Sequence, residues 1–319
     1  MTITNALYNL IEETPIETRK KIMNVLSLHS YNLPQQAYIN LLSALSPLID
    51  RPLDLLNIGR QGVGKDRCSI ELLVYALGLP HCVSFTHVTF ASFRDCLVSR
   101  YSTDHTLIFP ELNTIFRGGE HSEGMVEFLK TALDHKSVRV KLKTEDELYV
   151  KRFRSSIIGN VNTTAFRSED YYAMLSRVVF VSYPQGREYT CRVLDYMATR
   201  QYDQIYDSIE WISLKAYIEY LCSRSRYVKF YEHQEGITVL KEDIKRVFEE
   251  VEEYNSAREF LLGKKLAILD AFATKGFRYD EVPVTIENYW FASKVIEENI
   301  REKARWIGEY NGKMSRVWK

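Results

Sequence analysis

The eight-residue segment Gly59-Arg60-Gln61-Gly62-Val63-Gly64-Lys65-Asp66 constrains this chain more than any other feature. It has the spacing Gly, four residues, Gly-Lys, and it lies between an apolar stretch typical of a buried strand and a stretch typical of a helix. In such a phosphate loop, backbone N–H groups and the helix start surround a phosphate, and the lysine amine reaches the outer phosphates. The sequence therefore predicts an ATP site. Its expected contacts are Gly59, Gln61, Gly62, Val63, Gly64, Lys65, Asp66 and Arg67.

The last residue of the phosphate loop departs from the usual pattern, in which Ser or Thr supplies a hydroxyl to Mg²⁺. A carboxylate beside a triphosphate is repelled unless a cation lies between them. Asp66 therefore indicates either a direct Mg²⁺ ligand or an altered site. The alternative is a carboxylate that points into solvent and is favoured by the helix dipole.

A second apolar stretch, residues 105–109, ends in Pro110 and Glu111. P-loop ATPases usually carry Asp-Glu at this place, and a proline can hold neither Mg²⁺ nor its water. We expect Glu111 to act as the general base that polarises the attacking water. Asp66 could then supply the acid that is missing at position 110. The rival hypothesis is a site that binds ATP but hydrolyses it poorly.

A further predicted strand, residues 156–160, continues into a polar turn. An amide at the tip of a strand between the two motifs could orient the water or contact the terminal phosphate. Asn162 is the first candidate and Asn160 the second. The alternative is an asparagine in an ordinary strand-ending turn.

Apolar stretches separated by helical patterns predict an α/β fold, with a parallel sheet covered by helices on both faces. The strands are expected at residues 53–58, 106–109, 156–160 and 178–181, with a helix at about 65–77. After Pro184 the pattern turns helical, without further buried strands. We therefore expect a helical lead-in at 1–50, the sheet domain at 51–184 and a helical domain at 185–319.

Composition limits the partners and the compartment. The 42 basic and 42 acidic side chains balance, so any nucleic-acid contact must be local. The five cysteines are scattered, which indicates reduced core residues. No apolar run approaches the roughly 20 residues that a membrane helix needs, and the N-terminus lacks the features of a signal peptide. We expect a soluble, cytoplasmic protein without membrane contact.

The order of these motifs resembles the AAA+ ATPases, and within them the clade that includes the MCM helicases. The likeness is good over about 38–183 and loose over 255–300, whereas 185–254 resembles nothing that can be placed. Residues 128–140 look like the helix and the first strand of that clade's hairpin before the sensor strand. Residues 174–180 look like its Leu-Ser-Arg-Phe segment, and Arg258 opens a helix in the manner of its lid domain.

The resemblance implies a ring-forming homo-oligomer, expected to be a hexamer, that uses ATP and Mg²⁺. It implies that Arg177 reaches the neighbouring subunit's ATP and that Arg258 links the lid position to the nucleotide state. It also places the hairpin in the ring's pore, where Arg139, Lys141 and Lys143 would contact DNA phosphates without reading sequence. A solvated hairpin is the alternative.

The expected function is therefore an ATP-driven DNA translocase or helicase motor. Two other functions stay open: a remodeller or chaperone that acts on a partner protein, and an ATP-binding assembly scaffold with weak hydrolysis. The short architecture, without an appended DNA-binding domain, would suit replication of DNA or of a mobile element.

Overall fold

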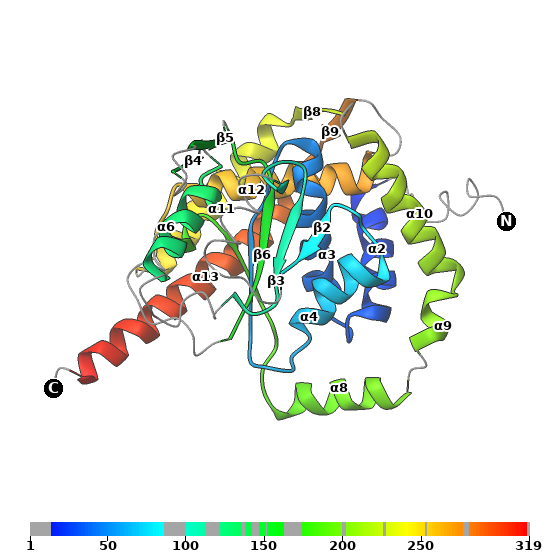
Figure 1. Ribbon diagram of the computed structural model, residues 1–319, viewed down its shortest axis with the longest axis horizontal. Helices are drawn as coiled ribbons and strands as arrows, with labels where there is room; N and C mark the ends of the chain where they lie inside the picture. The colour runs from blue at the N-terminus through cyan, green and yellow to red at the C-terminus, as the bar shows by residue number, and fades with distance from the viewer. Residues whose placement is uncertain are drawn as a thin grey trace.

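The centre of the protein is a five-stranded, all-parallel sheet with the order β2-β3-β6-β1-β7. The computed structural model describes residues 14–85, 100–112, 122–135, 138–141, 147–150, 152–162, 174–199, 202–225, 228–252, 254–276 and 281–317. Helices lie on both sides of the sheet (Figure 1). The predicted α/β fold is confirmed. The strands are β1 (Leu55–Ile58), β2 (Cys82–Ser84), β3 (Thr106–Phe109), β6 (Ser156–Val161) and β7 (Val179–Ser182).

Strand β6 lies between β1 and β3, because Ile158 pairs with Leu55 on one side and with Ile108 on the other. Every residue of β1, β3 and β6 is buried, which accounts for their mostly apolar sequences. Parallel strands end at the same edge of a sheet. The segments that follow β1, β3 and β6 therefore meet at one edge, which we call the strand-end edge.

Two helices precede the sheet, and each begins with a proline in its first turn. They are α2 (Pro15–His29), capped by the Thr14 hydroxyl, and α3 (Pro34–Leu45), followed by the 3-10 turn η1 (Ser46–Ile49). After the phosphate loop, the helix expected at 65–77 is split into α4 (Lys65–Cys68) and the π-helix η2 (Glu71–Ala76). The predicted continuous helix is therefore wrong in its middle.

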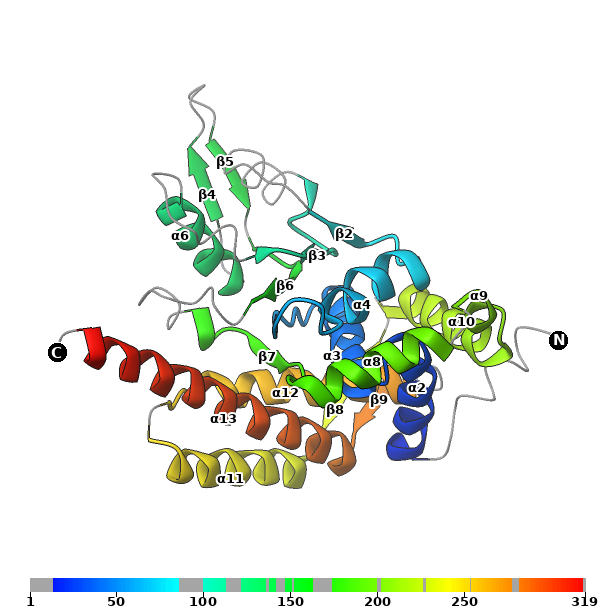
Figure 2. The same cartoon turned by 90° about the horizontal axis from the view of Figure 1, so that it is seen from below.

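An antiparallel hairpin follows a helix, as the resemblance implies. Helix α6 (Ser122–Leu133) leads into β4 (Val138–Lys141), which pairs with β5 (Glu147–Val150). The hairpin projects from the body of the molecule (Figure 2).

The second half of the chain is mostly helical but not entirely so. A parallel pair, β8 (Lys229–Glu232) and β9 (Glu281–Val284), lies in this half, where the sequence predicted no further buried strands. β8 is largely exposed, so it lacks the apolar run on which that expectation relied. The helices are α8 (Arg187–Thr199), α9 (Tyr202–Tyr206), α10 (Ile209–Arg224), α11 (Gln234–Glu250), α12 (Arg258–Lys275) and α13 (Ile286–Val317).

The hydrophobic core continues across the expected boundaries near residues 50 and 184. Buried polar contacts tie the same regions together. Arg19 of α2 donates to both carboxylate oxygens of Asp270 of α12, at 2.7 and 2.6 Å, and Tyr38 of α3 donates to the same carboxylate at 2.8 Å. The lead-in helices therefore form part of the main body.

A buried lysine fastens the longest helix to the edge of the sheet. Lys303 of α13 donates to the carbonyl of Val178 and to the Glu259 carboxylate, both at 2.7 Å. Asn299 of α13 accepts the N–H of Phe180 at 2.7 Å, so a side chain covers this position of the edge strand β7.

Two composition-based expectations can be compared with the structure. Cys68 and Cys82 are buried as expected, whereas Cys191 is exposed on α8. Among the described residues, no helix has both the length and the apolarity needed to cross a membrane.

Candidate nucleotide site

Lys65 lies at the centre of the phosphate loop and is 8% exposed. Its ammonium donates to the carbonyls of Gly59 and Arg60, both at 2.7 Å, and to the amide oxygen of Asn162 at 3.2 Å. Burial lowers the pKa of Lys65 to about 8, against the opposing attraction of Asp66. The fold therefore brings the predicted lysine and the first-choice amide together.

Backbone conformation and limited space explain why three positions of the loop are glycine. Gly62 and Gly64 have φ angles of 78° and 89°, in the left-handed region that favours glycine. A Cβ on Gly59 would lie 2.8 Å from Val63 Cγ2 and 3.0 Å from the Cβ of Tyr183. Gln61 and Gly62 are exposed, and Val63 is buried. The loop thus has a backbone that other residues would not readily adopt.

Asp66 lies at the start of α4, and its carboxylate accepts a hydrogen bond from strand β6. Its Oδ1 accepts from Asn160 Nδ2 at 2.7 Å, and the same nitrogen lies 3.0 Å from Ser69 Oγ. Burial raises the pKa of Asp66, and the charges of Glu71 and Glu111 raise it further, against the Asn160 hydrogen bond and Lys65. The second-choice amide therefore orients the candidate metal ligand.

Two buried asparagines that the sequence analysis did not identify support this arrangement. Asn57 of β1 donates to Asn160 Oδ1 at 2.8 Å. Asn40 of α3 and Asn57 exchange hydrogen bonds of 3.1 and 3.0 Å. A polar residue in each of two otherwise apolar segments was the available signal, because a buried amide requires a partner.

The turn after β3 places Glu111 at the same edge of the sheet. Glu111 is exposed, and its charge acts on Asp66. The next residue, Leu112, is buried against Gly159 of β6, where an added Cβ would lie 2.3 Å from Leu112 Cδ2. Gly159 thus makes room for the turn that carries Pro110 and Glu111.

The side chain of Arg67, which is expected among the nucleotide contacts, makes hydrogen bonds to two other parts of the chain. Its Nε donates to the carbonyl of His29 at 2.8 Å, and its Nη1 donates to Glu71 at 2.6 Å. Nε2 of His29 lies 3.1 Å from the carbonyl oxygen of Arg67, and Nδ1 lies 2.9 Å from the hydroxyl of Tyr206. The Arg67 side chain therefore fastens α4 to the end of α2.

Helix α8, from the segment that resembled nothing, contacts the phosphate loop. Tyr189 donates to the carbonyl of Val63 at 3.2 Å. Tyr31, with φ 51°, lies beside Gly64 and meets Tyr196 of α8 edge to face at 5.8 Å. The rest of α8 is largely exposed along the outside of the molecule (Figures 1 and 2). Aromatic side chains thus wall one side of the loop.

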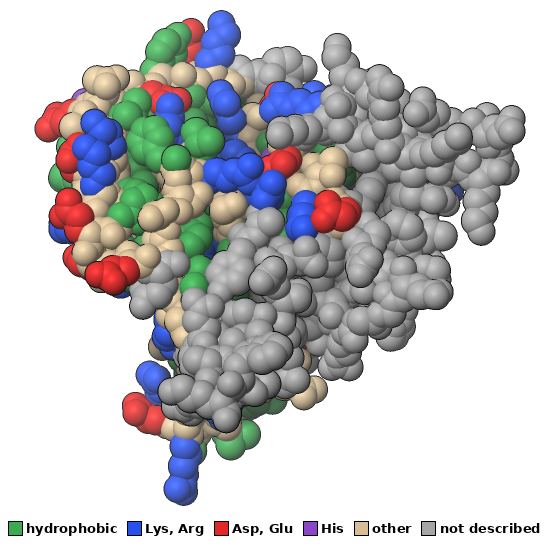
Figure 3. All heavy atoms as spheres, turned by 90° about the vertical axis from the view of Figure 1, so that its left-hand side faces the viewer, with side chains coloured by type: hydrophobic (Ala, Val, Ile, Leu, Met, Phe, Trp, Pro, Cys, Tyr) green, Lys and Arg blue, Asp and Glu red, His purple; other side chains and the backbone are tan. Residues whose placement is uncertain are grey.

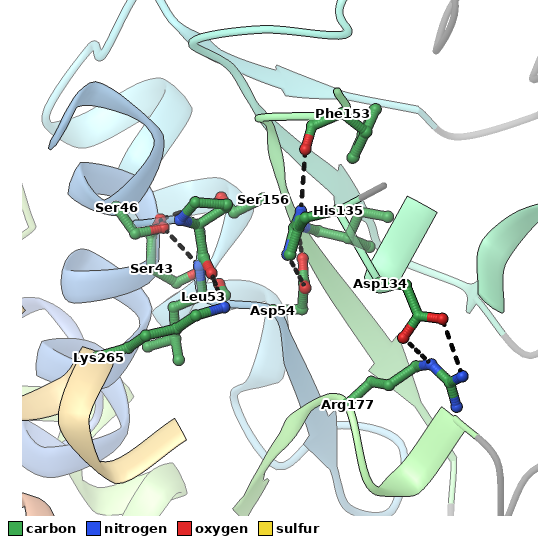
Figure 4. Close-up of polar contacts among 12 residues, drawn as sticks. Ser43, Ser46, Leu53, Asp54, Asp134, His135, Phe153, Ser156, Arg177 and Lys265 are labelled. Atoms are coloured by element: carbon green, nitrogen blue, oxygen red, sulfur yellow. Dashed lines mark hydrogen bonds and ion pairs between the residues drawn. The ribbon is translucent and has the colours of Figure 1, made fainter. Parts of the chain in front are cut away.

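Arg177 and Arg258 lie at the opposite edge of the sheet, where the strands begin. Arg177 Nε and Nη2 donate to the two oxygens of Asp134 at 2.7 and 3.1 Å, and Arg258 Nη1 lies 3.2 Å from the same carboxylate. Figure 4 shows the Arg177–Asp134 pair beside Asp54, which directly precedes β1. Four residues of β1 separate this strand-start edge from the phosphate loop, roughly 13 Å at about 3.3 Å per residue.

This placement bears on the expectations for both arginines. Within one protomer, neither arginine lies beside the loop that holds Lys65, and the link of Arg258 to the nucleotide state stays a prediction. The reach of Arg177 toward a neighbouring copy, which the resemblance implies, also stays a prediction.

The predicted nucleic-acid residues fall on the hairpin. In β4, Arg139 is paired with Tyr149 and Lys141 with Glu147 in the backbone register. Lys143 lies outside the described residues.

The donor set at the strand-end edge fits a hard cation only together with phosphate. Mg²⁺ takes one or two carboxylates plus phosphate oxygens and water in such sites. No cluster of three or more His, Cys, Asp or Glu side chains within the described ranges could hold a metal alone. Asp66, whose carboxylate is repelled by Glu71 and Glu111, is the group that a cation would relieve.

Comparison with known protein families finds no match for this chain, and comparison with curated protein sequences finds none either.

Proposed function

We propose that this chain binds and hydrolyses ATP at the phosphate loop, as a P-loop ATPase of the AAA+ type. The observation that carries the proposal is the meeting of Lys65, Asp66, Glu111 and Asn162 at one edge of a parallel sheet. These side chains come from segments that follow β1, β3 and β6. The strand order supports the proposal, because β6, the strand that leads to the amide of Asn162, lies between β1 and β3.

The residues divide the chemistry of phosphoryl transfer among them. A phosphate oxygen of ATP replaces a loop carbonyl as the acceptor for Lys65. Asp66 would hold Mg²⁺, which supplies neutralisation of phosphate charge when bound. Glu111 accepts the proton of the attacking water, and Asn162 orients that water or the terminal phosphate. Asn160 fixes the rotamer of Asp66 through its hydrogen bond.

Arg177 acts on the nucleotide of a second copy of the chain. Its guanidinium lies at the strand-start edge, so a ring in which one copy's strand-start edge meets the next copy's strand-end edge brings it to a phosphate. A planar, permanently charged group is suited to that task. Hydrolysis then depends on assembly, and a closed hexamer is the expected form.

DNA is the proposed substrate of the motor. The argument is the projecting hairpin β4–β5, whose sequence carries Arg139, Lys141 and Lys143. Repeated around a ring, these cations would contact phosphates without reading bases.

Steady-state ATP hydrolysis, with and without single- and double-stranded DNA, tests the proposal. DNA should raise the wild-type rate, and Lys65→Ala, Asp66→Ala and Arg177→Ala should each lower it by roughly 100-fold or more. A rate that rises with a protein partner and not with DNA would instead favour a remodeller.

One observation favours a second function, an ATP-binding assembly scaffold. Pro110 occupies the position of the usual metal-binding acid, which leaves Glu111 without a neighbouring carboxylate in sequence. Wild type that binds ATP yet turns it over no faster than Lys65→Ala would favour the scaffold.

A further inference from the structure

Three charged side chains from three separate segments converge at the strand-start edge. Asp134 directly follows α6, Arg177 precedes β7, and Arg258 begins α12. Asp134 and Arg177 are mostly buried, with 18% and 15% of their side chains exposed, whereas Arg258 is 40% exposed. On the side of the molecule that Figure 3 shows, Lys and Arg side chains gather with acidic ones among them.

The carboxylate of Asp134 stands on a fixed base. Its own N–H donates to the carbonyl of Lys130 at 3.1 Å. The next residue, His135, contacts Asp54 Oδ2 at 2.8 Å and the carbonyl of Phe153 at 3.2 Å, with its ring stacked on that of Phe153 (Figure 4). Asp54 is buried and also accepts the N–H of Ile157 at 2.8 Å. Asp134 is thus anchored to β1, to β6 and to the segment that follows the hairpin.

The Asp134 carboxylate contacts two guanidinium groups, and the two contacts differ in geometry. Arg177 makes the two-pronged contact that matches a guanidinium to a carboxylate. Arg258 Nη1 is close enough for an ion pair, yet it is a buried donor without a hydrogen bond among the described residues. A buried donor of this kind calls for a further acceptor. The charges of these three side chains sum to one positive charge, and Arg258 Nη1 is the donor that could accept an anion as its partner.

We infer that Asp134 is a positioning residue that holds Arg177 and Arg258 as a pair for a phosphate of the neighbouring copy's nucleotide. The inference rests on the proposed ATPase function and on assembly through the two edges of the sheet. Without the carboxylate, the two like charges repel each other and Arg177 loses its bidentate partner. The two guanidinium groups would then adopt many relative positions instead of one, and the rate of ATP hydrolysis would fall.

Asp134→Asn tests this, because it removes the charge and keeps the shape. Steady-state ATP hydrolysis should show kcat reduced by roughly 10- to 100-fold with KM changed by less than about threefold, since the loop that binds the nucleotide is untouched. Asp134→Glu should recover part of kcat. Asp134→Asn combined with Arg258→Ala should be little worse than either change alone, because both remove the same pair. The matched control is Glu127→Gln, which removes an exposed carboxylate of α6 that pairs with Lys130.

Mixing two defective proteins separates a positioning role from a merely structural one. Lys65→Ala retains its arginine pair, and Asp134→Asn retains its phosphate loop. Mixed rings should therefore hydrolyse ATP faster than the sum of the two proteins assayed separately. Asp134→Asn with unchanged kcat, or mixtures that are merely additive, would overturn the role of Asp134 while leaving the ATPase standing. Absence of wild-type turnover would overturn the role of Asp134 together with the proposed hydrolysis.

Discussion

At the scale of single residues, the candidate site depends on a lysine that is held in a buried position. The ammonium of Lys65 is surrounded by the carbonyls of its own loop and by Asn162. Burial favours the neutral amine, and a phosphate favours the cation. The proposed function therefore couples nucleotide binding to protonation of Lys65.

This coupling predicts a pH dependence of ATP affinity. Because the pKa of Lys65 is lowered from 10.5 to about 8, the amine loses its proton as the pH rises through 8. Affinity for a fluorescent ATP analogue should fall by up to about tenfold per pH unit above that value. Lys65→Arg, which stays charged, should give a flat profile at whatever affinity it retains. A flat wild-type profile from pH 7 to 9.5 would contradict the coupling.

His29 predicts a second pH effect, this time on stability. Burial and the neighbouring charge of Arg67 lower its pKa from 6.5 to about 3. Between about pH 6.5 and pH 3, His29 is protonated in the unfolded chain and neutral in the folded chain. The free energy of unfolding therefore decreases as the pH falls through this range. Between pH 7 and pH 5 the loss from this residue is about 2 kcal/mol. His29→Gln should reduce the pH dependence of urea unfolding by that amount, and an unchanged slope would contradict the argument.

At the scale of elements, the approach of β6 to the turn after β3 sets the position of Glu111. Gly159→Ala would place a Cβ 2.3 Å from Leu112 Cδ2 and 3.0 Å from Leu56 Cδ2, so Leu112 must move. We expect turnover to fall more than about tenfold, with ATP affinity within roughly threefold of wild type. Adding Leu112→Ala should restore turnover in part. Equal turnover in Gly159→Ala and wild type would show that this packing does not position Glu111.

The attachment of α13 to β7 predicts a large effect on stability. Lys303→Met would leave the Glu259 carboxylate buried without its cation, which costs about 3 to 5 kcal/mol in comparable cases. Adding Glu259→Gln should recover much of that loss in urea unfolding. Lys294→Met, on the exposed face of the same helix, is the control and should change stability little. A loss under about 1 kcal/mol for Lys303→Met would refute the account.

Some elements could be predicted from the sequence and others could not, for physical reasons. The four predicted strands are mostly apolar in sequence and almost wholly buried, and the structure contains all of them. β8 is largely exposed, so its sequence lacks this apolar pattern. The π-helix η2 (Glu71–Ala76) keeps the composition of an α-helix and differs only in its hydrogen bonding. Local patterns therefore record burial better than backbone hydrogen bonding.

The same limit applies to the candidate site. Loop spacing identified Lys65, and strand ends identified Glu111 and Asn162, because parallel strands bring their ends together. A polar residue in an apolar strand marked Asn57 as buried but not its partner Asn160, and the contact of Tyr189 with Val63 joins distant segments and had no local signal. For Arg67, proximity in sequence suggested a phosphate contact, whereas tertiary packing directs its side chain to His29.

At the scale of the whole molecule, the lead-in helices and the helical second half stabilise each other through the buried Arg19–Asp270 pair. Arg19→Met should therefore lower the stability of both halves together. Amide hydrogen exchange should show the opening free energies of β1 and α12 falling by similar amounts. A decrease confined to one half would indicate separate folding units.

The most direct test of the account is the affinity of the protein for ATP, measured by titration of a fluorescent analogue into wild type and Lys65→Ala in the presence of Mg²⁺. The account predicts saturable binding by wild type and affinity weakened by at least about 100-fold in Lys65→Ala, with an unchanged unfolding transition. Equal affinities, or absence of binding by well-folded wild type, would contradict the assignment of the loop at residues 59–66 as a nucleotide site.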